Sequence, residues 1–200
     1  MLTVEKIGGT SMTKFHEVLK NIIIGNRNDF DLYNRVFVVS AYGGVTNLLL
    51  EHKKTGEPGV YEMFVKHDDY NRGLQKVLNQ LLEINRTFAD IKLNVEAADN
   101  FITNRIVQAK NYLNSLADVL ATGYVSQHNI LLAAREILAS IGEAHSAYNS
   151  VNILENNGIN ATLVDLCGFN DSEFLTIDER IKRSFRDIDY SKTIPIVTGY

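Results

Sequence analysis

Two apolar segments, each followed by a pair of glycines, constrain the fold of this chain more than any other feature. Residues 35–40 read Arg-Val-Phe-Val-Val-Ser, a run without alternation that is typical of a strand covered on both faces. Residues 3–8 predict a shorter strand. A glycine pair follows each strand, and a segment that looks helical follows each pair. The order strand, glycine loop, helix therefore occurs twice, which predicts a parallel α/β sheet.

The segments around these two units extend the same pattern. A helix over residues 15–23 should end at Gly25, a glycine of the helix-terminating kind, and a second helix should cover residues 45–53. The last part of the chain adds four predicted elements: a helix from about Glu143 to Gly158, a strand over 161–165, a short helix over 178–186 and a final strand over 194–198.

The middle of the chain, roughly residues 55–138, has a different character. After a turn at residues 55–59 it is mostly helical, and its apolar residues form stripes at helical spacing. The stripes carry no cofactor signal. We interpret them as amphipathic helices that pack on the sheet or on each other.

Composition and charge exclude several classes of protein. Of the 200 residues, 45% are hydrophobic, enough for a globular core. The net charge of −4 argues against a nucleic-acid partner, which usually requires a basic surface. A single cysteine, Cys167, cannot form an internal disulfide. The sequence has neither a signal-peptide layout nor an apolar run of about 20 residues, so we expect a cytoplasmic protein without membrane contact.

The first glycine loop, residues 6–11, reads Lys-Ile-Gly-Gly-Thr-Ser. Glycines let backbone N–H groups approach an anion closely, and a lysine beside them suits oxygens that gain negative charge during phosphoryl transfer. The loop is not a Walker motif, because its lysine precedes the glycines. Two interpretations remain open: a phosphate site, or a plain turn with a solvent-facing Lys6.

The second glycine loop, residues 38–47, reads Val-Val-Ser-Ala-Tyr-Gly-Gly-Val-Thr-Asn. Neighbouring parallel strands would place both loops at the same edge of the sheet, where ligands of such sheets bind. Two polar glycine loops there suit a small anionic substrate together with a phosphate. Thr46 and Asn47 have a second interpretation, because both residue types are favoured helix caps.

A third segment, residues 140–146, reads Ser-Ile-Gly-Glu-Ala-His-Ser. Ser140 followed three residues later by Glu143 has the pattern of a capping box at a helix start, which the local sequence favours. The alternative is that the Glu143 carboxylate binds the ammonium group of a substrate.

Together the three segments resemble the amino-terminal part of aspartokinases, in the amino-acid kinase superfamily. Those enzymes have K-F-G-G-T-S-V at the start, V-S-A-x-G-G-V-T-N after the second strand and S-x-G-E-x-x-S before a later helix. This chain has KIGGTSM, VSAYGGVTN and SIGEAHS in the same order. The differences at Ile7 and Met12 are conservative. The variant KIGGTSM is similar to aspartokinases associated with ectoine synthesis.

The resemblance implies a fold and an activity. The fold would be a three-layer α/β/α sandwich with a mainly parallel sheet, and residues 55–138 would be a helical insertion packed against one side. The activity would be ATP-dependent phosphorylation of the side-chain carboxylate of L-aspartate to 4-phospho-L-aspartate, with Mg²⁺ accompanying ATP. This reaction begins aspartate-family amino-acid (including lysine) or ectoine biosynthesis.

On the phosphate side, the resemblance assigns roles to residues of the first loop. Lys6 would be catalytic, stabilising charge on the transferring phosphoryl group. Gly8, Gly9 and Ser11 would form a backbone cradle around the phosphates of ATP. No residue is assigned to a metal.

On the substrate side, the resemblance assigns roles to the second and third segments. Ser40 and Thr46 would hydrogen-bond the aspartate, and Gly43 and Gly44 would shape their loop. Glu143 would bind the α-ammonium group.

Aspartokinases also carry a G-R-G-G-S-D segment, adenine-binding loops and ACT domains, none of which occurs in residues 1–200. The resemblance therefore implies the amino-terminal portion of a catalytic domain, inactive alone. Two alternatives remain: a non-catalytic module that binds an amino acid, or a superfamily kinase with another acceptor. We also expect a homo-oligomer, because the sheet should present an open edge and an apolar face.

Overall fold

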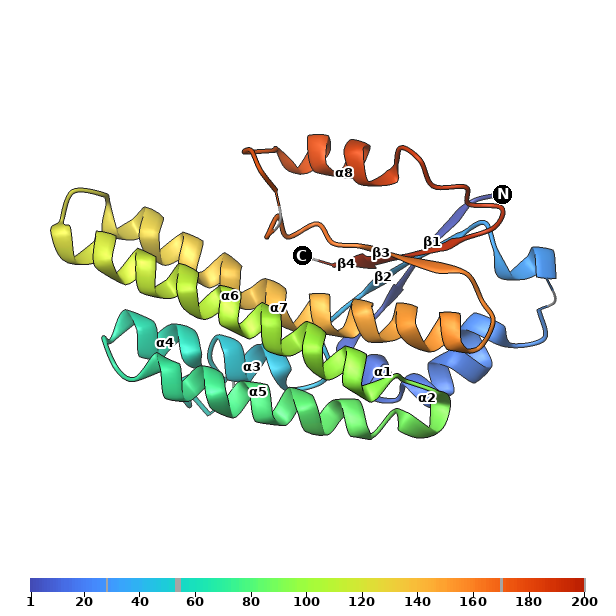
Figure 1. Ribbon diagram of the computed structural model, residues 1–200, viewed down its shortest axis with the longest axis horizontal. Coiled ribbons are helices and arrows are strands. Elements are labelled where there is room, and N and C mark those ends of the chain that lie inside the picture. The colour runs from blue at the N-terminus through green and yellow to red at the C-terminus, as the bar shows by residue number, and fades with distance from the viewer. Residues whose placement is uncertain (28, 53–54, 170, 200) are drawn as a thin grey trace.

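The computed structural model describes residues 1–27, 29–52, 55–169 and 171–199. Its centre is a four-stranded sheet of β1 (Thr3–Ile7), β2 (Arg35–Val39), β4 (Ile194–Thr198) and β3 (Ala161–Val164), in that order across the sheet. Each neighbouring pair is parallel (Figure 1). The predicted parallel sheet is confirmed.

The strand register places the carboxyl ends of the strands at one edge of the sheet. Ile7 pairs with Val39, and Val39 pairs with Thr198. Val164 of the outer strand pairs with Val197. The loops that follow β1 and β2 therefore leave the sheet side by side.

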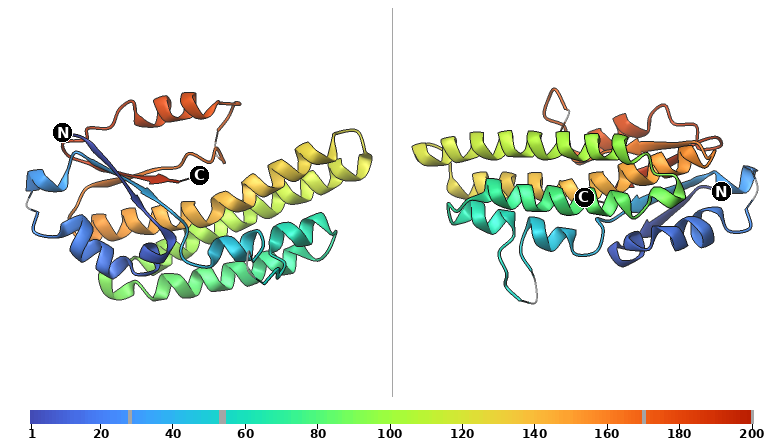
Figure 2. Two further views of the ribbon diagram at one scale, coloured as in Figure 1. Left: turned by 180° about the vertical axis from the view of Figure 1, so that it is seen from behind. Right: turned by 60° about the horizontal axis from the view of Figure 1, so that its bottom comes forward.

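Helices cover both faces of the sheet, which confirms the three-layer α/β/α sandwich. Helix α8 (Ile177–Phe185) lies on one face and α7 (Gln127–Asn156) on the other (Figures 1 and 2). Under α8, a small apolar cluster that includes Val36 and Val197 packs against Phe185. The larger core lies on the α7 side of the sheet.

The helices between the first strand and α7 lie on the α7 side of the sheet in both figures. They are α1 (Gly9–Thr13), α2 (Phe15–Glu17), the π-helical segment Val18–Ile24, α3 (Val45–Leu49), α4 (Val60–Val65), α5 (Tyr70–Arg86), the short 3₁₀ segment Ala89–Ile91 and α6 (Val95–Thr122). A further 3₁₀ segment, Asp29–Leu32, precedes β2. In the described ranges, none of the helices combines the length and apolar character that crossing a membrane requires.

The helix predictions before residue 138 are largely confirmed. The segment over 15–23 is helical and ends at Gly25, whose φ of 54° favours glycine. Residues 55–138 are mostly helical. The helix predicted over 45–53 is shorter and ends at Leu49, because Glu51 forms an antiparallel bridge with Pro58. Residues 53 and 54 lie outside the described residues.

The start of α7 differs most from the prediction. We expected the helix to begin at about Glu143, but it begins at Gln127 and runs without interruption to Asn156. Ser140 therefore lies in mid-helix, where its Oγ donates to the Ile137 carbonyl oxygen at 2.8 Å. An N-cap residue needs a non-helical backbone. The capping-box interpretation of Ser140 and Glu143 is therefore wrong.

A pair of alanine substitutions tests this assignment. Thr176 is a true capping box residue, since its side chain accepts from the Glu179 N–H and the Glu179 carboxylate accepts from the Thr176 N–H. Thr176→Ala should lower the free energy of unfolding by about 1 kcal/mol. Ser140→Ala should change it by less than about 0.5 kcal/mol, because alanine is the better helix former. Urea denaturation measures both; a larger loss for Ser140→Ala would contradict the continuous helix.

Candidate functional site

The candidate site lies at the edge of the sheet where the strands end. The Ser40 N–H donates to the Ile7 carbonyl oxygen at 3.0 Å, and the Gly199 N–H donates to the Val39 carbonyl oxygen at 3.1 Å. These bonds continue the strand pairing just past β2 and β4. The first loop (residues 6–11), the second loop (residues 38–47) and Gly199 therefore begin beside one another.

The two glycine loops are in direct contact. A Cβ at position 9 would lie 2.7 Å from the Ala41 carbonyl oxygen, so Gly9 is required by space. Thr13 joins the loops, because its Oγ1 accepts from the Gly43 N–H at 2.8 Å and donates to the Gly9 carbonyl oxygen at 3.1 Å. Sequence reasoning missed Thr13, since nothing local marks a bond to a residue 30 positions away.

Helix α7 packs on the second loop and carries Glu143 to the strand ends. A Cβ at position 142 would lie 2.7 Å from the Ala41 Cβ, so only glycine permits this approach without a shift. One turn later, Ser146 Oγ donates to the Ser40 carbonyl oxygen at 2.9 Å. Neither Gly142 nor Ser146 was singled out from the sequence, although both belong to the third motif.

Glu143 is a carboxyl group partly removed from water. A Cβ at position 199 would lie 3.4 Å from its Oε1, and its Oε2 is buried with no hydrogen-bond partner among the described residues. Burial raises the pKa of Glu143 to about 7, and the positive charge of Lys6 opposes that rise. The structure thus brings Lys6 and Glu143 into one electrostatic environment. A carboxylate of this kind is suited to a cationic ligand.

The remaining predicted residues occupy the starts of α1 and α3. Gly8 is the N-cap of α1, and Ser11 lies within that helix. Gly44 is the N-cap of α3 with φ of 86°, a conformation that favours glycine. Thr46 and Asn47 therefore lie inside α3, and their interpretation as caps is wrong. Ser11 and Thr46 are exposed at the same edge.

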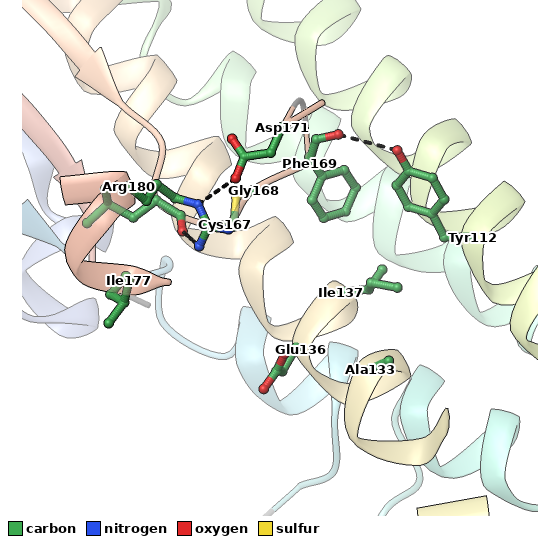
Figure 3. A pocket seen from close by; sticks show the side chains of 11 residues that line it. Tyr112, Ala133, Glu136, Ile137, Cys167, Gly168, Phe169, Asp171, Ile177 and Arg180 are labelled. Atoms are coloured by element: carbon green, nitrogen blue, oxygen red, sulfur yellow. Dashed lines mark hydrogen bonds and ion pairs between the residues drawn. The ribbon is translucent and has the colours of Figure 1, made fainter. Parts of the chain in front are cut away.

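A cavity of about 450 Å³ lies beyond the end of β3 (Figure 3). Tyr112, Phe169 and Arg180 line it, and Arg180 is held by Asp171 at 2.8 Å. Cys167 also lines this cavity, and burial raises the pKa of its thiol to about 12. The thiol is therefore protonated at neutral pH, the form that does not act as a nucleophile.

Within the described ranges, no three residues of the types His, Cys, Asp or Glu lie close enough together to hold a metal ion. The polar groups at the strand ends include Lys6, Glu143, hydroxyl groups and backbone N–H groups. This set can bind a ligand that carries both an ammonium group and anionic oxygens.

Comparisons with known proteins show the family to which this chain belongs. The model of the amino acid kinase family matches residues 1–200. Over 203 aligned positions, which cover all of this chain, 46% of residues are identical to those of Aspartate kinase Ask_Ect from Stutzerimonas stutzeri (strain A1501). The chain spans 43% of that relative's length.

Two solved structures cover 98% of this chain and 40% of their own chains. E. coli aspartokinase III in complex with lysine and aspartate (T-state) has a TM-score of 0.54 at 20% identity, which shows a shared fold. The same enzyme in complex with aspartate and ADP (R-state) has a TM-score of 0.42 at 21% identity.

The contact between the glycine loops predicts different effects for two neighbouring substitutions. Gly9→Ala should lower the free energy of unfolding by about 1–3 kcal/mol, because its Cβ would push against the Ala41 carbonyl oxygen. Gly8→Ala is the matched control: nothing lies within 4 Å of a Cβ there, and its φ of −75° is open to alanine. Chemical denaturation that ranks Gly8→Ala as the more damaging change would contradict the loop contact.

The raised pKa of Glu143 predicts a pH-dependent stability. The unfolded chain loses this proton near pH 4.5 and the folded protein near pH 7, so stability should fall as pH rises between these values. Glu143→Gln removes the titration. Its melting temperature should exceed that of the wild type at pH 8 and approach it at pH 4.5. Glu136→Gln, at an exposed position on the same helix, is the control and should show no such pH-dependent gain.

Proposed function

The chain belongs to the amino acid kinase family, and from this premise we propose that it binds L-aspartate and acts in its ATP-dependent phosphorylation to 4-phospho-L-aspartate. The family resemblance of the three motifs is confirmed by the family model. The identity of 46% with Aspartate kinase Ask_Ect supports aspartate as the acceptor. That name also agrees with the resemblance to ectoine-associated aspartokinases.

The position of Glu143 is the observation that carries the proposal. An amino-acid substrate brings an ammonium group, and the Glu143 carboxylate, whose Oε2 has no hydrogen-bond partner among the described residues, can accept a hydrogen bond from it. A charge-assisted bond of this kind contributes more than a neutral one. Ser40 and Thr46, on the loop shaped by Gly43 and Gly44, would then hydrogen-bond the carboxylates of the substrate.

The proposed reaction requires little covalent chemistry from the protein. The side-chain carboxylate of aspartate is already ionised at neutral pH, so no general base is needed. One carboxylate oxygen forms a bond to the γ-phosphorus of ATP. The bond from that phosphorus to the bridging oxygen breaks, and ADP leaves with the electron pair. Catalysis then consists of positioning and electrostatic stabilisation.

The first loop would hold the phosphates. Gly9 brings its backbone close to the second loop, and Lys6 is exposed at the same edge. In the proposed roles, Gly8, Gly9 and Ser11 surround the phosphate oxygens, and the Lys6 ammonium group stabilises the charge that the transferring phosphoryl group gains. Lys6 lies close enough to Glu143 to influence its pKa, so both would act on one bound substrate.

The proposal also includes a metal ion, an oligomeric state and a pathway. Mg²⁺ would accompany ATP, since it neutralises phosphate charge; no residue of this chain is assigned to it. We also propose a cytoplasmic homo-oligomer in aspartate-family (including lysine) or ectoine biosynthesis.

Binding of L-aspartate tests the substrate half of the site. Calorimetry should detect L-aspartate binding to the wild-type chain at pH 8. Glu143→Gln should weaken that binding by about 10-fold or more, the value of a hydrogen bond between charged groups. Succinate, which lacks the ammonium group, should bind the wild type as weakly as L-aspartate binds the variant. Equal affinity for both ligands would contradict the role of Glu143.

Trapping of aspartyl phosphate as its hydroxamate tests the phosphate half. In whichever length of this protein forms the product from ATP, Mg²⁺ and L-aspartate, Lys6→Ala should lower turnover by about 10²-fold, with a smaller effect on aspartate binding. Unchanged turnover would make the first loop a plain turn. Aspartate binding without any effect of ATP would favour a non-catalytic binding module. Phosphorylation of a different substrate would favour a kinase with another acceptor.

A further inference from the structure

A cluster of buried polar side chains lies directly beneath the second loop. It contains Tyr42 of that loop, Asn85 of α5, Asp99 of α6, and His145 and Asn149 of α7. Asn85, His145 and Asn149 are 0% exposed, and Tyr42 is 3% exposed. Burying polar groups costs free energy unless they are hydrogen-bonded. The hydrogen bonds among these side chains must therefore offset the cost of burying them beneath the second loop.

The cluster is connected by hydrogen bonds that converge on the loop. Asn149 Nδ2 donates to Asn85 Oδ1 at 2.8 Å and to the Tyr42 hydroxyl oxygen at 3.2 Å. Asn85 Nδ2 in turn donates to Asp99 Oδ1 at 2.7 Å. Two acceptor atoms, His145 Nδ1 and Asn149 Oδ1, have no partner among the described residues.

His145 completes the support of Asn85. Burial lowers the pKa of His145 to about 3, so the imidazole is neutral at physiological pH. Its Nε2 lies 2.6 Å from Asn85 Oδ1, and we assign the proton to Nε2, which then donates to that oxygen. Asn85 Oδ1 therefore accepts two bonds from α7, and the amides of Asn85 and Asn149 are fixed in orientation.

Tyr42 transmits this arrangement to the second loop. Its ring lies between Phe88 and His145, with centroid separations of 5.4 Å to each. Its chain neighbours are the contact points described above, Ala41 against α7 and Gly43 against Thr13. Tyr42 is thus held by its ring, by its hydroxyl group and through both chain neighbours. These contacts restrict the motion of the second loop.

We propose that Asn149, supported by Asn85 and His145, is a positioning residue that holds the second loop in register with Glu143 through the Tyr42 hydroxyl group. Because Asn149 and Glu143 lie on the same helix, the bond to Tyr42 fixes the loop relative to the carboxylate. That the loop in this register binds aspartate rests on the proposed function. None of these side chains would touch the substrate.

Removal of one hydroxyl group tests the proposal, and the chain offers a matched control. Tyr42→Phe deletes the bond to Asn149 and leaves the ring in place. Tyr70→Phe also deletes a Tyr–Asn hydrogen bond, in which the Tyr70 hydroxyl group donates to Asn114 Oδ1 at 2.9 Å between α5 and α6. Both variants should fold and lose similar amounts of thermal stability, since each loses one hydrogen bond.

Amide hydrogen exchange of the ligand-free chain is the first readout. In Tyr42→Phe, the amides of residues 40–47 should exchange about 5-fold to 10-fold faster, the factor that corresponds to one hydrogen bond. In Tyr70→Phe they should exchange at the wild-type rate. Equal exchange in all three proteins would overturn the proposal, whatever the chain binds.

Aspartate affinity is the second readout. Tyr42→Phe should weaken L-aspartate binding by a similar factor, and Tyr70→Phe should leave it unchanged. Faster exchange together with unchanged affinity would show that the Tyr42 hydroxyl group holds the loop but that the position of the loop does not affect aspartate binding. The link between Asn149 and aspartate binding would then be overturned. If the wild type shows the exchange pattern but binds no aspartate, the proposed function fails and the support of the loop by Asn149 stands.

Discussion

At Gly142, helix α7 packs directly against the side chains of Ala41 and Val45 in the second loop, because glycine has no side chain to keep them apart. A Cβ there would lie 2.7 Å from that of Ala41 and 2.9 Å from Val45 Cγ1, so any larger residue would move the helix away from the loop. The same helix carries Glu143, Ser146 and Asn149. The position of this one helix therefore determines where the Glu143 carboxylate lies and how the second loop is supported.

Because α7 is continuous, Glu143 lies in mid-helix and its carboxylate does not cap a helix. In a capping box its carboxylate would accept a backbone N–H, which stabilises the charged form. In mid-helix the backbone N–H groups are already bonded within the helix. The carboxylate is therefore left partly dehydrated, with Oε2 unpartnered in the described part of the chain and a raised pKa. This costs stability in the free protein, and a bound ammonium group would recover it.

The strands and the two glycine loops could be predicted from the sequence, because short apolar runs and glycine pairs are local signals and parallel pairing follows from their order. The start of α7 could not be predicted from the sequence. Ser140 and Glu143 have the same sequence spacing whether they cap a helix or lie within one. The earlier start of α7 depends on the burial of Ile130 and Leu138, and α7 packs against α6, which the local sequence does not reveal. Thr13 and Asn85 were missed for a related reason, since their partners lie 30 and 60 positions away.

Buried polar groups have two different consequences in this fold. Asn85 and Asn149 bond mainly to other protein groups, and such bonds stiffen the structure around them. Glu143 lies where the strands end, and its buried Oε2 has no hydrogen-bond partner among the described residues. A rigid support beneath a loop and an unsatisfied carboxylate beside it are the conditions under which a small charged ligand can be held in one orientation.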